Sequence, residues 1–193
     1  ISALNTGTGT TFSGASPNVN TGGGGVTINE KLVIGNGELD INTAGGNIAI
    51  TGAITGTAGN NESLILDDGT GNGTITLGST VGAGGHISDL TSISTGTAVD
   101  SVKLGGNIKT SDNAGGAISI TGPVTLTTDV AIDADAANTT VTFNSTSTVN
   151  ATSAGGQGLT IDTGAGTMSV GGAGGGPAKL GGLCIDRAAA GAG

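Results

Sequence analysis

Short alternating segments run along the whole chain, each with an apolar residue, one intervening residue and a second apolar residue. Alternation with a period of two places successive side chains on opposite sides, which is the pattern of a β-strand with one buried face. Clusters of Gly, Asn, Asp and Ala separate the segments, and these residues suit tight corners. The segments are residues 26–28, 32–34, 39–41, 48–50, 64–66, 75–77, 102–104, 118–120, 124–126, 130–132, 141–143, 159–161, 168–170 and 183–185. The sequence therefore predicts an all-β chain of very short strands.

Similar segments return along the chain at two spacings. The shorter spacing is roughly 20 to 27 residues, as from Ile48 to Ile75, and fits one turn of a parallel β-solenoid. The longer spacing is about 93 residues, because 73–78 (GTITLG) matches 166–171 (GTMSVG) and 64–71 resembles 159–166.

The fold prediction is therefore a parallel β-helix, or β-solenoid, of about eight coils. It forms a single domain over residues 1–193, with about two copies of a unit of about 93 residues, approximately 1–93 and 94–193. Residues 1–25 and 187–193 are expected to be irregular or to take part in stacking at the ends.

Two other fold classes compete with the solenoid. A β-sandwich is the first, but it gives no reason for an echo at about 93 residues or for strands this short. A disordered chain is the second, and Gly-rich composition favours it. Disordered chains combine low hydrophobicity with high charge, whereas this chain is 35% hydrophobic and 10% charged.

Composition excludes several classes of protein. The 193 residues include 41 Gly but no Trp or Tyr, and 14 acidic against 5 basic residues give a formal charge of −9. Nucleic acid is excluded as a partner, because phosphate binding needs clustered Lys and Arg with aromatic platforms. A helical bundle and collagen are also excluded. No apolar run reaches 18 residues, so no transmembrane segment is expected.

Pairs of carboxylates are the first candidates for chemistry. Asp67 and Asp68 are adjacent, and Asp133 and Asp135 lie on one side of a predicted strand end. Two carboxylates can serve as acid and base in glycan cleavage. Asp is also an ordinary corner residue beside Gly or Ala, and we assign no catalytic residue.

Metal, cofactor and phosphate sites are not assigned either. Residues 35–40 (GNGELD) only approximate the calcium-binding nonapeptide, since the Asp comes one position late. His86 and Cys184 are the single His and Cys, so one chain cannot build a cluster of these ligands. We expect Cys184 to fill a small slot in the core, with an outward position as the alternative. The glycine runs at 22–25 and 171–176 lack the Lys and Ser or Thr of a phosphate loop.

Three strings carry a resemblance to a known family: residues 46–52 (GNIAITG), 63–67 (SLILD) and 159–166 (LTIDTGAG). They resemble the repeats of filamentous-haemagglutinin-like adhesins and related haemagglutinin-repeat exoproteins of bacteria. The resemblance covers residues 26–186 and implies a right-handed β-helix, export to the cell surface or the medium, and a role in adhesion or surface structure. The amino-terminal secretion domain of the family is not evident, and its members are usually far longer.

Three functions are compatible with these observations. The first is a non-enzymatic extracellular module, either a stalk segment or the subunit of a surface filament. Neither end has a polar cap, so we expect continuation in a longer chain or head-to-tail homopolymers, with cell-surface glycans as further partners. The second is a glycan-binding or glycan-cleaving β-helix protein. The third is binding to ice or mineral surfaces through Thr arrays.

Overall fold

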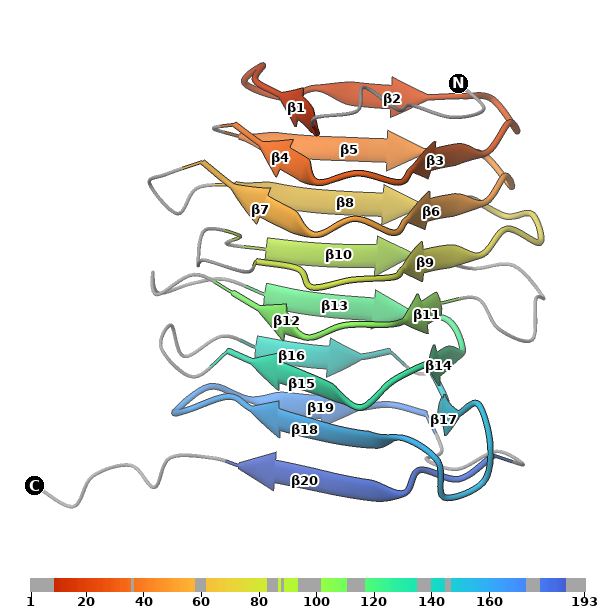
Figure 1. The fold of residues 1–193 in the computed structure, drawn as a ribbon, viewed down its shortest axis with the longest axis vertical. Helices are drawn as coiled ribbons and strands as arrows, with labels where there is room; N and C mark the ends of the chain where they lie inside the picture. The colour runs from red at the N-terminus through yellow and green to blue at the C-terminus, as the bar shows by residue number, and fades with distance from the viewer. Residues whose placement is uncertain are drawn as a thin grey trace, which may run out of the picture.

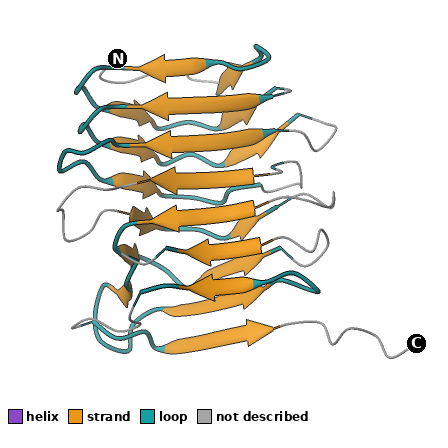
Figure 2. Cartoon of the chain, turned by 180° about the vertical axis from the view of Figure 1, so that it is seen from behind, coloured by secondary structure: helices purple, strands orange, loops and turns teal. Residues whose placement is uncertain are grey.

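The chain folds as a right-handed parallel β-solenoid. The computed structural model describes residues 9–35, 37–57, 62–82, 87, 89–93, 102–110, 117–134, 140–144, 147–172 and 178–186, and these residues contain strands but no helix. In Figure 1 the chain crosses the front from right to left and returns behind from left to right while it descends, which is a right-handed coil. Figure 2 shows the same stack from behind.

Three faces make the wall of the solenoid, and all their strand pairings are parallel between neighbouring turns. Face A comprises β3 (Val26–Ile28), β6 (Ile48–Ile50), β9 (Ile75–Leu77), β11 (Val102–Leu104), β14 (Val124–Leu126) and β17 (Val149–Ala151). Face B comprises β1 (Thr10–Phe12), β4 (Leu32–Ile34), β7 (Ile54–Gly56), β12 (Ile108–Lys109), β15 (Val130–Asp133), β18 (Gly158–Asp162) and β20 (Gly182–Asp186). Face C comprises β2 (Asn18–Asn20), β5 (Glu38–Asn42), β8 (Ser63–Asp67), β10 (Asp89–Ile93), β13 (Ala117–Thr121), β16 (Thr140–Phe143) and β19 (Met168–Val170).

Face B narrows in the middle of the stack. Its first three strands and its last four form separate sheets. Among the described residues, Val81 alone joins them, through single bridges to Ile54 above and Ile108 below. The fourth rung of this face is therefore reduced to one paired residue.

The interior consists of columns of aliphatic side chains. Along face A, for example, Val26, Ile48 and Ile75 are partners in register on successive turns, and each is at most 3% exposed. The alternate positions, such as Thr27 and Thr76, point outward. Each rung places its apolar residues on those of the next rung, so neighbouring turns bury one another. The predicted alternation of buried and outward positions is confirmed.

The number of turns is smaller than the sequence estimate of about eight. Face C holds seven strands, which corresponds to about six turns. The estimate is slightly high, and the turns vary in length. Partners in register are 22 residues apart from Val26 to Ile48 but 29 apart from Val130 to Leu159. The extra residues lie in connections between faces and add no rung.

The 93-residue correspondence joins strands on different faces. Leu64 lies on face C and its counterpart Leu159 on face B, while Ile75 lies on face A and Met168 on face C. A shift of 93 residues therefore does not span a whole number of turns. Of the segments expected to be irregular, the described part of the first already contains β1 and β2, and residues 1–8 and 187–193 lie outside the described residues.

The corners after β2, β5 and β8 repeat one hydrogen-bonding pattern. The side-chain Oδ1 of Asn20, Asn42 and Asp67 accepts a hydrogen bond from the backbone N–H two residues ahead, over 3.1, 3.0 and 2.7 Å. The donors Gly22, Ala44 and Gly69 all have positive φ angles. Such a turn lets the chain leave face C sharply and begin face A one rung further on.

Candidate functional site

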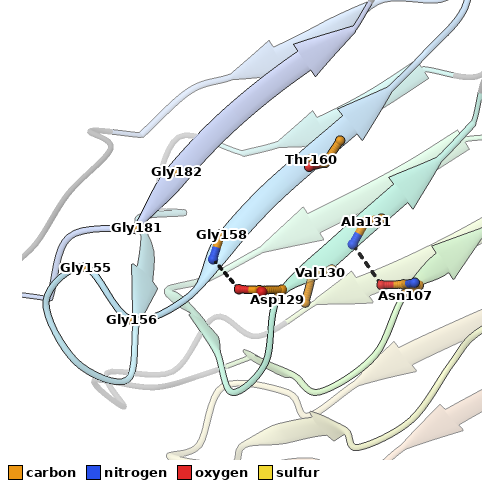
Figure 3. A pocket seen from close by; sticks show the side chains of 10 residues that line it. All are labelled: Asn107, Asp129, Val130, Ala131, Gly155, Gly156, Gly158, Thr160, Gly181 and Gly182. Atoms are coloured by element: carbon orange, nitrogen blue, oxygen red, sulfur yellow. Dashed lines mark hydrogen bonds between the residues drawn. The ribbon is translucent and has the colours of Figure 1, made fainter.

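A polar groove lies on the outer side of face B, in the C-terminal half of the solenoid. It consists of two adjoining hollows of about 660 and 290 Å³ that share Asn107 and Ala131. The larger hollow is shown in Figure 3, where its residues come from the connection before β12 and from the region of β15, β18 and β20. We call these two hollows the B groove.

Small residues make the floor of the B groove. Register places Gly158 and Gly182 in one outward column and Ala131, Thr160 and Cys184 in the next. Asp129 directly precedes β15 and is hydrogen-bonded to Gly158. A Cβ atom added to Gly182 would have no heavy atom within 4 Å. The hollow therefore exists where Ala131, Gly158 and Gly182, on three successive rungs, carry little or no side chain.

Two side chains at the groove are fixed by hydrogen bonds to the backbone. Asn107 Oδ1 accepts from the N–H of Ala131 over 2.9 Å, and Asp129 Oδ1 accepts from the N–H of Gly158 over 2.8 Å (Figure 3). Each bond crosses from one rung to the next, so it stabilises the stack and also orients the side chain. The Asn107 amide group thus has a defined position, as does the second carboxylate oxygen of Asp129.

Charged residues flank the second hollow. Lys109 Nζ lies 2.9 Å from Asp133 Oδ2, and both side chains are roughly two-fifths exposed. Asp133 is in register with Asp162, which is in register with Asp186. An outward column of three carboxylates therefore starts below Lys109. This column was not predicted from the sequence, although the dipeptide Ile-Asp ends all three strands and is a usable signal.

Of the carboxylate pairs considered for catalysis, the described pair Asp67 and Asp68 does not present its two groups together. Asp68 is fully buried at a corner, whereas its neighbour Asp67 faces outward and holds the turn through Gly69. Asp133 is paired with Lys109, and Asp135 lies outside the described residues. Among the described residues, these Asp side chains therefore stabilise corners and the contacts between neighbouring rungs.

Asp40 and Asp67 form a small acidic area on the outside of face C. Asn18 Nδ2 donates to Asp40 Oδ2 over 2.8 Å, and Asn42 Nδ2 donates to Asp67 Oδ2 over 3.2 Å. Partial burial raises the pKa of Asp40 above its ordinary value, and the negative charge of Asp67 raises it further. The raised pKa therefore belongs to a carboxyl group that is hydrogen-bonded to the neighbouring rung of face C.

The remaining sequence candidates are distributed along the stack. Of residues 35–40, Glu38 and Asp40 lie in β5 with buried Leu39 between them, and Asn36 lies outside the described residues, as does His86. The described part of the chain contains no group of three or more His, Cys, Asp and Glu residues placed to hold a metal ion. The glycines at 22–25 belong to the first of the stacked corners.

Cys184 is exposed, so the expected core slot is wrong. It occupies an outward position of β20, in register with Thr160. The sequence suggested burial because free Cys is usually buried and because Leu183 and Ile185 flank it. Those two neighbours take the inward positions.

The C-terminal end of the solenoid exposes its apolar interior. The exposed large hydrophobic side chains among the described residues are Val170, Leu183 and Ile185, at 46, 57 and 47%. They belong to the last two strands, β19 and β20. An apolar hollow of about 420 Å³, lined by Phe143, Leu159 and Leu183 among others, opens there. Among the described residues, no further apolar layer covers the last two strands.

Threonine does not form an unbroken ladder on face A. Thr27 and Thr76 point outward, but Ala49 stands between them in the same column and Lys103 follows. A regular array of Thr on one flat face is what binding to ice would use. This column interrupts such an array twice.

Comparison with protein-family models, with curated proteins and with solved structures finds no match for this chain. In the described portion, no helix has the length and apolar character needed to span a membrane. The solenoid, its open end and the B groove are therefore the features from which function is inferred.

Proposed function

We propose that the chain is a non-enzymatic structural and adhesive module of a bacterial cell surface, acting as a stalk segment or as the subunit of a filament. The observation that carries this proposal is the open C-terminal end. Leu183 and Ile185 continue the inward columns of face B, and Val170 continues that of face C, but no further rung covers them among the described residues.

The surface that fits this end is another rung of the same kind. The backbone of β20 pairs with β18 on one side only, so its other edge presents a row of hydrogen-bonding groups. Exposed strand edges beside an apolar core favour the addition of a parallel strand. Such a rung comes either from a longer chain or from the first turn of a second copy. Both forms extend the solenoid along its axis.

An extracellular, adhesive role is supported by the outer surface and by the sequence resemblance described above. Outward positions carry many Thr, Ser and Asn side chains and few charged ones, as on face C with Ser119, Thr142 and Ser169. A rigid rod with a polar, repetitive outside suits a spacer between a cell and its surroundings. The proposal includes no catalytic step, and it gives the acidic residues at the corners and in the ladder a structural role.

Electron microscopy of the purified chain at low and high concentration tests the proposal. Long unbranched fibres with an axial repeat of about 4.8 Å are expected for the filament form. The variant Leu183→Lys with Ile185→Lys should give short single rods, because it places charges on the stacking surface. The control Thr76→Lys adds a charge to the side of the rod and should leave the fibres intact.

Single short rods from the unmodified chain at all concentrations would contradict the filament form and favour the stalk segment. Fibres that persist in the double variant would contradict stacking through β20.

A further inference from the structure

We propose that the B groove binds an extended oligosaccharide of neutral or amino sugars, lying along the axis of the solenoid. The inference goes beyond the structural role, and it does not depend on stacking at the ends. It rests on the direction of the groove, the repeat of its floor, its donors and acceptors, and its charge.

The groove runs across the strands. Asn107, Ala131, Thr160 and Gly182 lie at four successive rungs of face B, and all four line the larger hollow. A peptide that adds to a sheet must lie parallel to its strands and use a free edge. Of the strands in the groove, β15 and β18 are paired on both sides, and β20, at its end, has one free edge. A ligand that fills the groove therefore extends from rung to rung and is recognised over β15 and β18 by side chains.

The floor repeats at the spacing of parallel strands, which is about 4.8 Å. This spacing is close to the length of one hexose unit in an extended glycan chain. Gly158 and Gly182 occupy one column of the floor, so a flat ring can approach the backbone closely at successive rungs. Successive sugar units would thus meet similar surroundings.

The groove offers a donor and an acceptor in fixed positions. Asn107 Oδ1 accepts the hydrogen bond from Ala131, so the amide hydrogens of Asn107 point away from that bond and can donate. Asp129 accepts from Gly158 through only one of its two carboxylate oxygens. The Thr160 hydroxyl is exposed on the floor. Sugar hydroxyls both donate and accept, so they match such a mixture without needing a charged group.

Charge selects among sugars. Asp129 and Asp133 belong to the groove, and its cation Lys109 is already paired with Asp133. The net negative charge of the groove would repel uronic acids and sulfated sugars. It would not repel neutral sugars, and it would attract amino sugars. No aromatic ring lines either hollow. We therefore expect weak binding by a short oligomer, with a Kd of about 1 mM.

Titration of the 193-residue chain, followed by NMR or calorimetry, tests the site. The probes are cellohexaose, chitohexaose and a chitosan hexamer, with a polygalacturonate hexamer as the anionic comparison. Gly182→Leu adds a large side chain to the floor of the larger hollow, and its Cβ has no heavy atom within 4 Å. Ser169→Leu adds the same side chain to exposed face C and is the matched control. Thermal unfolding of both variants checks that the fold is retained.

The expected result is saturable binding of at least one neutral or amino-sugar hexamer, weakened at least about tenfold in Gly182→Leu and unchanged in Ser169→Leu. Asp129→Asn keeps an oxygen for the Gly158 N–H and should reduce the preference for the chitosan hexamer over cellohexaose. The proposal is overturned if none of the three hexamers binds at several millimolar. Equal binding by Gly182→Leu, or a preference for polygalacturonate, overturns it as well.

Discussion

Ala44 and Gly69 occupy equivalent positions on neighbouring rungs, and both have left-handed backbone conformations, with φ of 51° and 74°. Each donates its N–H to the side chain two residues earlier, Asn42 or Asp67. Ala44 is the one described residue other than glycine with a positive φ. A side chain in this conformation is strained by roughly 1–2 kcal/mol, so this corner contains a correctable defect.

Replacing Ala44 with glycine should therefore stabilise the protein. The released strain is partly offset by the greater freedom of glycine in the unfolded chain, about 0.4–1 kcal/mol. We expect a net gain of up to about 1 kcal/mol in the free energy of urea unfolding. The control Ala49→Gly lies in β6 of the same turn and should lose stability. A loss in Ala44→Gly would contradict this account of the corner.

Gly52 illustrates the opposite case, in which a corner has no room for any side chain. A Cβ atom at this position would lie 1.9 Å from the carbonyl oxygen of Glu30 on the preceding turn. Gly52→Ala must push two rungs apart and should cost about 1–3 kcal/mol, seen as a lower melting temperature. Gly182→Ala is the matched control, since nothing lies within 4 Å. Equal melting temperatures for the two variants would show that the turns are not in tight contact at Gly52.

The pKa of Asp40 predicts a pH-dependent effect on stability. Burial and then Asp67 raise it, so the folded chain holds this proton more tightly than the unfolded chain does. The contribution of protonated Asp40 to the stability of the fold is fully present below the unfolded pKa of about 3.9. It is lost as the pH rises through the higher pKa of the folded chain. Ionised Asp40 therefore destabilises the fold at neutral pH.

Asp40→Asn should accordingly be more stable than the unmodified chain at pH 7, and the difference should shrink to nothing at about pH 3. Urea midpoints at both pH values measure it. Asn retains an oxygen for the hydrogen bond from Asn18. Asp186→Asn removes the same charge from another face and controls for net charge. A stability difference that does not change with pH would argue against the burial and charge effects.

A charge in the interior should unfold the neighbouring rungs. Ile120 is fully buried, and it is in register with buried Phe143 on the next turn. Ile120→Asp leaves a carboxylate without compensation and should cost more than about 3 kcal/mol. Hydrogen exchange should accelerate first in β13 and β16. Thr142→Asp, outward on the neighbouring rung, should be close to neutral, and equal effects of the two changes would contradict the predicted interior.

The alternation in the sequence was sufficient to predict most of the strands. All 14 alternating segments lie in strands, because two large aliphatic residues around one outward residue need an apolar column to cover them. Strands β1, β2, β7, β10, β12 and β17 contain none of these segments. β7 ends in Gly56, β12 consists of two residues and β17 carries Ala151 in an inward position, so each of these three lacks the second large apolar residue.

The B groove could not be predicted from the sequence, because it depends on register between rungs. Asn107 and Gly182 are 75 positions apart in the chain, and only the lengths of the intervening turns place them along one groove. Those lengths vary with the connections between faces, and the estimate of eight turns was slightly high. The side chain of Cys184 was predicted to face the wrong way for a related reason. Alternation shows that neighbouring residues point to opposite sides of the strand, but it does not show which side faces inward.

The stacking direction also determines how the molecule would carry load. The backbone hydrogen bonds between rungs point along the axis, and β1 and β20 lie at opposite ends of the stack (Figure 1). Tension applied between the ends therefore breaks the hydrogen bonds of one rung at a time, rather than those of all the rungs together. Each opening would release one turn, which here means 22 to 29 residues of extended chain. A stalk of this kind lengthens in steps under tension. The rungs that are still folded remain as a template on which the released turns can fold again.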